Sequence, residues 1–169
     1  KTSNTIISQP IKGTAKRNLE NEALDIAARN YLLNSEKEKS ENVMIVDLVR
    51  NDLSKVCTEG SVQVTELFGV YPFPQVHQLI STIEGNVNED TPFTANLEAC
   101  FPMGSMTGAP KKRVMELIEQ YEQTPRGLFS GSIGYITPSA DFDFNVVIRS
   151  LMLDASQKLI SFKAGGGIT

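Results

Sequence analysis

The sequence predicts an α+β fold, in which a mainly antiparallel β-sheet is packed with helices. The clearest helix covers residues 109–122, where apolar residues recur on one helical face and Pro110 suits the first turn. Three strand-like runs follow it, at 130–138, 143–153 and 158–165, and turn-forming residues separate them. These runs indicate turn-connected strands with helices packed on them.

The first half of the chain contains two further helix signals. A short apolar run at 5–8 predicts a strand that ends before a proline. Residues 18–33 carry apolar side chains near helical spacing, which predicts a helix. Ser35 and Glu38 then resemble a capping box, so a second helix is expected from about 36 to 55.

The middle of the chain predicts two strands and a short helix. Residues 61–70 alternate well enough for a strand, and Gly60 marks the turn before it. Residues 76–85 also favour a strand, although their period alone leaves a helix open. Residues 93–101 favour a short helix.

Composition and charge limit the class of protein. The chain has 169 residues, 40% hydrophobic and 21% charged, which suits one globular domain. Its net charge of −4 gives no indication of a nucleic-acid or membrane-surface partner. No apolar run approaches the roughly 20 residues of a membrane span, and no signal-peptide core is visible. Cys57 and Cys100 follow no metal-binding pattern, so we expect reduced thiols in a cytoplasmic protein.

Two acidic residues are candidate metal ligands. Glu38 and Glu41 are three residues apart on the expected second helix and therefore share a face. Carboxylates so placed can bind Mg²⁺, which takes oxygen ligands and keeps several waters. The alternative is a solvated charged face, because lysines alternate with glutamates in this segment. Glu41 directly precedes an apolar stretch, where partial desolvation strengthens cation binding.

Two glycine-containing segments are candidate anion sites. Ser105 lies between Gly104 and Gly108, just before the helix at 109–122, where backbone N–H groups favour an anion. A plain loop with a helix cap explains these residues equally well. The glycines at 165–167 would let backbone amides approach a ligand closely.

Three single residues have both a functional and a structural interpretation. Arg149 stands in an apolar run, where it needs either a structural acid or a ligand carboxylate as a partner. His77, the single histidine, is either an active-site group or a satisfied structural residue. Lys12 precedes a glycine and is either a surface charge or a nucleophile, and a nucleophilic amine must be neutral.

Taken in order along the chain, six motifs resemble the chorismate-utilising enzymes, which include anthranilate, aminodeoxychorismate, isochorismate and salicylate synthases. The resemblance covers about residues 9–169. It implies an anthranilate synthase component I-like chorismate-binding fold. The motifs are "PIKGT", "ENVMIVDLVRNDL", "FPMGSMTGAPKKRVMELI", "RGLFSGSIGYI", "VVIRSLML" and "KAGGGI".

The resemblance implies a role for each candidate. Glu41 would bind Mg²⁺ with help from Glu38, and the ion would hold the ring carboxylate of chorismate. Lys12 and His77 would be catalytic, His77 near the leaving hydroxyl. Arg149 would pair with the enolpyruvyl carboxylate. The expected substrate-binding residues are Gly13, Thr14, Ser105, Phe129, Arg149, Gly165, Gly166 and Gly167.

Lys12 separates the branches of this family. Anthranilate synthases usually have alanine at this position, whereas lysine resembles component I of the aminodeoxychorismate synthases. That branch converts chorismate and ammonia, supplied by a glutamine amidotransferase, to 4-amino-4-deoxychorismate for 4-aminobenzoate and folate. The resemblance implies a covalent lysine adduct on the way. An anthranilate or isochorismate/salicylate-type synthase, and a non-catalytic ligand-binding module, remain the alternatives.

The resemblance also implies that the chain is only part of a catalytic domain. A second Mg²⁺ glutamate and a general-acid glutamate of the family are expected outside residues 1–169. The sequence therefore predicts a C-terminal part of the domain, incomplete at both ends, with little activity in isolation.

Overall fold

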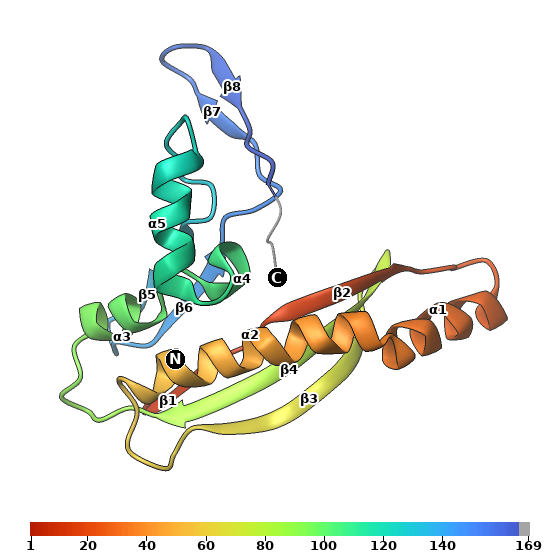
Figure 1. The fold of residues 1–169 in the computed structure, drawn as a ribbon, viewed down its shortest axis with the longest axis horizontal. Helices are drawn as coiled ribbons and strands as arrows, with labels where there is room; N and C mark the ends of the chain where they lie inside the picture. The colour runs from red at the N-terminus through yellow and green to blue at the C-terminus, as the bar shows by residue number, and fades with distance from the viewer. Residues whose placement is uncertain (166–169) are drawn as a thin grey trace. The chain divides into compact units, whose positions relative to one another are not determined.

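The computed structural model describes residues 1–165 and divides the chain into two compact units (Figure 1). We call Asn4–Ala99 the sheet unit. Lys1–Ser3 and the chain from Cys100 onward form what we call the hairpin unit. Both units mix helices with antiparallel strands, which confirms the predicted α+β class. In the part of the chain that is described, no helix is long and apolar enough to cross a membrane.

The sheet unit is built around its longest strand, β4 (Val76–Asn86), which pairs antiparallel with three others. β3 (Gln63–Pro72) runs along most of β4. β1 (Thr5–Ser8) pairs with one end of β4, and β2 (Ile11–Lys16) pairs with the other. Because a strand has only two edges, β1 and β2 share the edge that β3 leaves open.

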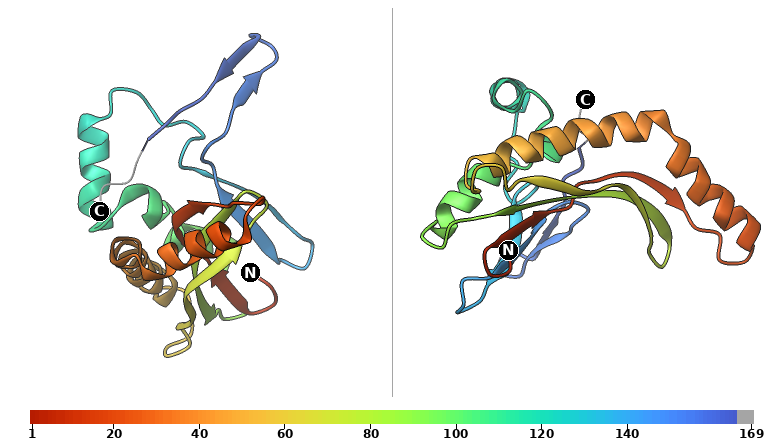
Figure 2. Two further views of the ribbon diagram at one scale, coloured as in Figure 1. Left: turned by 90° about the vertical axis from the view of Figure 1, so that its right-hand side faces the viewer. Right: turned by 90° about the horizontal axis from the view of Figure 1, so that it is seen from below.

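Two helices cover one face of this sheet. They are α1 (Glu22–Asn34) and α2 (Glu36–Ser54). His77 and Ser81 are four residues apart on β4 and therefore point to the same face. His77 bonds to Asp25 of α1, and Ser81 bonds to Asn42 of α2, so both helices lie over that face (Figure 2).

The hydrophobic core of the sheet unit lies between these helices and β4. Among the described residues, the buried apolar side chains are Ile6, Leu32, Ile45, Val46, Leu53, Leu79, Ile80, Ile83 and Val87. β4 is buried over nearly its whole length, which explains why its sequence shows no clear alternation. The structure settles the open alternative at 76–85 in favour of a strand. α3 (Phe93–Cys100) then ends this unit.

The hairpin unit contains two helices and two hairpins. The helices are α4 (Gly104–Thr107) and α5 (Lys111–Tyr121). The hairpins are β5 (Ser132–Ile136) with β6 (Phe142–Val146), and β7 (Met152–Asp154) with β8 (Leu159–Ser161). The N-terminal ammonium of Lys1 donates to the carbonyl of Phe142 at 2.6 Å, which ties the start of the chain to β6.

The structure differs from the sequence prediction in three places. The single strand expected at 143–153 is wrong, because β6 ends at Val146 and Arg149 has φ 52°, which no extended strand contains. Residues 11–16 form strand β2, which was not predicted from the sequence. A register shift between Ile11 and Thr14 accommodates the glycine within the strand. A helical turn, α4, replaces the loop expected at 104–107.

The cap between the two long helices gives a test of the fold. The hydroxyl of Ser35 accepts the backbone N–H of Glu38 at 3.4 Å, which is one half of the predicted capping box, whereas the N–H of Ser35 bonds to the carbonyl of Leu32 and not to the Glu38 side chain. We expect Ser35→Ala to lower the free energy of unfolding by about 1 kcal/mol, because this N–H loses its partner. Urea denaturation followed by circular dichroism measures the change.

Ser40→Ala is the matched control, because Ser40 is exposed within the same helix and alanine has the higher helix propensity. We expect no loss of stability in this variant. An equal loss in both variants would show that the cap contributes nothing.

Candidate functional site

Lys12 is not a freely solvated surface charge. It lies on β2, and its Nζ is 3.8 Å from Oε2 of Glu41 on α2. Only 17% of the Lys12 side chain and 27% of the Glu41 side chain are exposed. Strand and helix therefore hold the amine beside a carboxylate in a partly desolvated setting, where charge interactions are stronger than in water.

Gly13 allows the start of α2 to approach β2. Its φ of +96° is in the region that favours glycine. A Cβ at this position would stand 3.0 Å from Cδ1 of Leu32 and 3.2 Å from both Cβ and Oε2 of Glu38. Lys12, Gly13, Glu38 and Glu41 thus form one group of residues, which we call the β2–α2 cluster.

The β2–α2 cluster fits part of a Mg²⁺ site. Glu38 and Glu41 provide two carboxylates on one face of α2, and Mg²⁺ is often bound by one or two carboxylates together with waters and ligand oxygens. Within residues 1–165, no group of three or more histidine, cysteine or acidic side chains forms a complete metal site. Lys12 and Lys37 both pair with Glu41, at 3.8 and 3.9 Å, so a bound cation would compete with two ammonium groups.

His77 is buried, and only one of its two ring nitrogens has a hydrogen-bond partner among the described residues. Its side chain is 3% exposed, and Nε2 lies 3.1 Å from Oδ1 of Asp25. Nδ1 is buried and has no hydrogen-bond partner among the described residues. The structural interpretation of this histidine therefore accounts for one ring nitrogen and leaves the other unexplained.

Asp25 is the functional candidate that sequence reasoning missed. Arg17 donates to both of its oxygens, at 2.9–3.3 Å, and the N–H of Asn18 donates to Oδ1 at 2.9 Å. The pKa of Asp25 falls to about 2, chiefly because of the hydrogen bonds from Arg17. No sequence pattern links Arg17, Asp25 and His77, because β2, α1 and β4 are joined only by folding.

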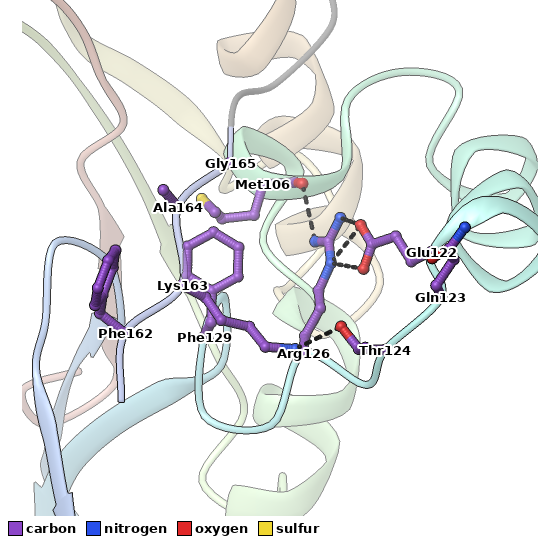
Figure 3. Close-up of a pocket in the computed structure, with 10 residues that line it drawn as sticks. All are labelled: Met106, Glu122, Gln123, Thr124, Arg126, Phe129, Phe162, Lys163, Ala164 and Gly165. Carbon is purple, nitrogen blue, oxygen red and sulfur yellow. Dashed lines mark hydrogen bonds and ion pairs between the residues drawn. The ribbon is translucent and has the colours of Figure 1, made fainter. Parts of the chain in front are cut away.

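The hairpin unit contains a pocket of about 460 Å³ (Figure 3). Two predicted substrate-binding residues, Phe129 and Gly165, line it, and a Cβ on Gly165 would stand 3.2 Å from Cζ of Phe129. All lining residues are Met106, Glu122, Gln123, Thr124, Arg126, Phe129, Phe162, Lys163, Ala164 and Gly165.

Two cations in this pocket were not predicted from the sequence. Lys163 contacts the carbonyl of Pro125 and lies 3.3 Å from Oγ1 of Thr124. Arg126 pairs with Glu122, and their hydrogen bonds raise the pKa of the Arg126 guanidinium and lower the pKa of the Glu122 carboxyl. Arg126 and Lys163 are the first residues of two of the six motifs, "RGLFSGSIGYI" and "KAGGGI", so the sequence offered a signal for both, but their clustering depends on the fold.

Arg126 also shapes the pocket. Its Nη1 donates to the carbonyl of Met106 at 3.3 Å and to Oγ of Ser130 at 3.1 Å. One guanidinium therefore joins α4, the end of α5 and the segment that carries Phe129. Because five N–H donors lie in one rigid plane, arginine can hold several segments at once.

The remaining predicted residues are not gathered in these two places. Thr14 is exposed on β2 opposite Gln78. Ser105 is half-buried in α4, beside Met106, and does not line the pocket. Arg149 is exposed after β6, and its guanidinium makes no ion pair or hydrogen bond to any residue within 1–165. Gly166 and Gly167 lie outside the described residues.

Comparison with known proteins places the chain in a family. The model of the chorismate binding enzyme family matches residues 1–169, and the chain belongs to this family. The predicted resemblance is therefore confirmed. The fold agrees, since anthranilate synthase component I from Streptococcus pneumoniae TIGR4 is similar with a TM-score of 0.77 and 33% identity. That similarity covers 89% of this chain and 32% of the other. MenF, an isochorismate synthase from Escherichia coli, shares the fold with a TM-score of 0.75 and 20% identity, over 88% of this chain and 33% of its own.

Curated relatives are more similar in sequence. The chain is 45% identical over 161 residues to an aminodeoxychorismate synthase from Streptomyces pristinaespiralis, which covers 95% of the chain and 22% of that protein. It is 46% identical over 163 residues to aminodeoxychorismate synthase component 1 from Escherichia coli K12, which covers 96% of the chain and 35% of that protein. The chain thus spans between about a fifth and about a third of these relatives.

The contact at Gly13 gives a second test. We expect Gly13→Ala to lower the free energy of unfolding by about 1–3 kcal/mol beyond the strain of a left-handed alanine, because the new methyl group meets Leu32 and Glu38. Urea denaturation measures the loss.

Gly60→Ala is the control for this test. Gly60 has φ +76°, and nothing lies within 4 Å of its Cβ position, so this variant carries the backbone strain without the contact. Equal losses in the two variants would show that β2 and α2 do not pack closely at Gly13.

Proposed function

We propose that this chain is part of the catalytic domain of component I of an aminodeoxychorismate synthase and supplies residues that bind and aminate chorismate. The observation that carries the proposal is the partly buried amine of Lys12 on β2, which lies 3.8 Å from the carboxylate of Glu41 on α2. The curated relatives at 41–46% identity, which carry this name, support the same activity.

The proposed reaction uses Lys12 as a nucleophile. Its neutral amine attacks C2 of chorismate, both conjugated double bonds of the ring shift by one position, and the C4 hydroxyl leaves as water once it has gained a proton. Ammonia then adds at C4 and loses a proton, both double bonds shift back, and Lys12 leaves from C2 as an amine. Two displacements through one covalent intermediate retain the geometry at C4 and split a difficult step in two. The amine must be neutral when it attacks, and Glu41 lies 3.8 Å from its Nζ.

The other residues would orient the substrate. Glu41 and Glu38 would hold Mg²⁺, which would neutralise a carboxylate of chorismate when bound. Arg149 and the amides around Gly165 would pair with substrate carboxylates. His77 would lie near the hydroxyl that leaves from C4. Holding both carboxylates in place would bring C2 into a reactive position.

The source of ammonia is also part of the proposal. The Escherichia coli and Salmonella typhimurium relatives are named component 1, which supports a second component that supplies ammonia. A glutamine amidotransferase, as a subunit or domain, is the partner we propose, in a cytoplasmic enzyme.

Two alternatives make different predictions. An anthranilate or isochorismate-type synthase would form a 2-substituted product. The similarity to anthranilate synthase component I from Streptococcus pneumoniae supports this alternative. A non-catalytic binder would hold chorismate unchanged.

The adduct on Lys12 tests the proposal. When the full-length enzyme is incubated with chorismate and Mg²⁺ without ammonia, we expect a mass increase equal to chorismate less one water, located on Lys12 by peptide mapping. Lys12→Ala should remove the adduct and lower formation of the 4-amino product at least about 10²-fold, because the nucleophile is lost.

Lys16→Ala is the matched control, because Lys16 is exposed on the same strand. It should retain both adduct and product. A normal yield of 4-amino product from the Lys12→Ala enzyme would refute the covalent role.

Metal binding can be tested without turnover. We expect Glu41→Gln to weaken Mg²⁺ binding by about tenfold or more in isothermal titration calorimetry, because one of the two clustered carboxylate charges is lost. Glu36→Gln removes a charge from the exposed start of the same helix and should leave binding within about twofold. Unchanged affinity in the Glu41 variant would exclude the β2–α2 cluster as the Mg²⁺ site.

A further inference from the structure

The single histidine of the chain occupies a confined position on the sheet. His77 lies opposite Ala15 of β2 and opposite Pro72 of β3, so strands flank it on both edges of β4. Over the helix-covered face, Nε2 lies 3.1 Å from Oδ1 of Asp25 on α1. With 3% of its side chain exposed, the imidazole is almost entirely shielded from bulk water.

Asp25 can act only as an acceptor in this position. Arg17 and the N–H of Asn18 already donate to it, and its pKa of about 2 leaves it ionised at neutral pH. An ionised carboxylate has no proton to donate. The bond to His77 therefore requires the proton to be on Nε2.

Asp25 is itself held in place. Three contacts join its two oxygens to Nε and Nη2 of Arg17, a forked arrangement that fixes the carboxylate in orientation as well as in position. Nη1 of Arg17 also donates to the carbonyl of Phe73, in the turn between β3 and β4, at 3.3 Å. The carboxylate is thus anchored to the hairpin that carries His77.

The other ring nitrogen has no assigned partner. Nδ1 is buried and makes no hydrogen bond to the described part of the chain. A buried polar atom without a partner is unfavourable, and in a native structure it calls for an explanation such as a ligand or a catalytic role. With Nε2 committed to Asp25, Nδ1 is the nitrogen left for a ligand.

We propose that Asp25 is a positioning residue that fixes His77 with its proton on Nε2, so that Nδ1 is the nitrogen that exchanges a proton with the ligand. This inference rests on the proposed function, which places His77 at the leaving hydroxyl. Asp25 touches no substrate in this scheme; it acts through the imidazole. A carboxylate behind a histidine sets its tautomer and stabilises the charged ring when the other nitrogen gains a proton.

The tautomer can be measured directly, without chorismate. Long-range ¹H–¹⁵N correlation spectra of the 169-residue chain at pH 8 contain one imidazole, because the sequence has one histidine. We expect a protonated-type shift for Nε2 and an unprotonated-type shift for Nδ1. A proton on Nδ1 would overturn the proposal from the unmodified chain alone.

Variants of Asp25 and Arg17 test which of these two residues sets the tautomer of His77. Asp25→Ala should replace the single tautomer by a mixture, because the acceptor is lost. Arg17→Gln should leave the tautomer unchanged, because Asp25 stays. Asp47→Ala is the control, since it breaks an exposed Asp–Arg pair on α2 that does not involve His77. A tautomer that survives Asp25→Ala would contradict the proposal.

Kinetics of the full-length enzyme distinguish positioning from a purely structural role. We expect Asp25→Ala to lower kcat for the 4-amino product by about 10²-fold or more with KM changed less than about threefold, and Asp25→Glu to restore part of kcat. An unchanged kcat in Asp25→Ala would overturn the proposal. A wild-type enzyme with the expected tautomer and no 4-amino product would instead refute the proposed function and leave the tautomer assignment standing.

Discussion

The first turn of α2 packs against β2 at Gly13, and the arrangement of charges in the sheet unit depends on this contact. Without a Cβ at Gly13, Leu32 and Glu38 occupy space that any other side chain would need. Hydrogen bonds to β4 hold β2 in place, and the hydroxyl of Ser35 caps α2. Lys12 and Glu41 consequently meet across two rigid elements, which is the preorganisation that a reacting or metal-binding group requires.

The helix-covered face of β4 contains polar groups within an otherwise apolar core. Oγ of Ser81 donates to Oδ1 of Asn42 at 2.5 Å, and both residues are fully buried. Nδ2 of Asn42 has no partner within residues 1–165. His77 lies on the same face, with Nδ1 also unpartnered there. Because burial of polar atoms opposes folding unless they are hydrogen-bonded, the two unpartnered nitrogens are unfavourable within this core.

Hydrogen bonds from one arginine side chain join several segments of the hairpin unit. Its helices and hairpins are short, and one arginine joins several of them. Arg126 contacts Glu122, the Met106 carbonyl and Ser130. These contacts hold in place the segment that carries Phe129, which lines the pocket. Charge-assisted hydrogen bonds of this kind fix a loop where there is too little apolar surface to do so. Lys163, next to the glycines, adds a second cation to the pocket lining.

The sequence by itself determined the class of fold, the family and most of the long elements. The helical period and the Ser35 cap predicted α2 almost to its ends, because both signals are local. The motif around Lys12 identified a candidate nucleophile, and the spacing of Glu38 and Glu41 placed both carboxylates on one helix face. The strand at β2 and the break at Arg149 were not predictable, because each depends on pairing with distant residues and on a single backbone angle.

Only the tertiary structure decided which groups meet. Asp25 and His77 are far apart in the sequence, and nothing near either residue points to the other. They pair because β4 places the imidazole under α1 and because Arg17 leaves Asp25 ionised. Local sequence encodes periodicity and caps, whereas an ion pair, a tautomer or a pocket lining depends on distances that exist only after the strands have paired and the helices have packed on them.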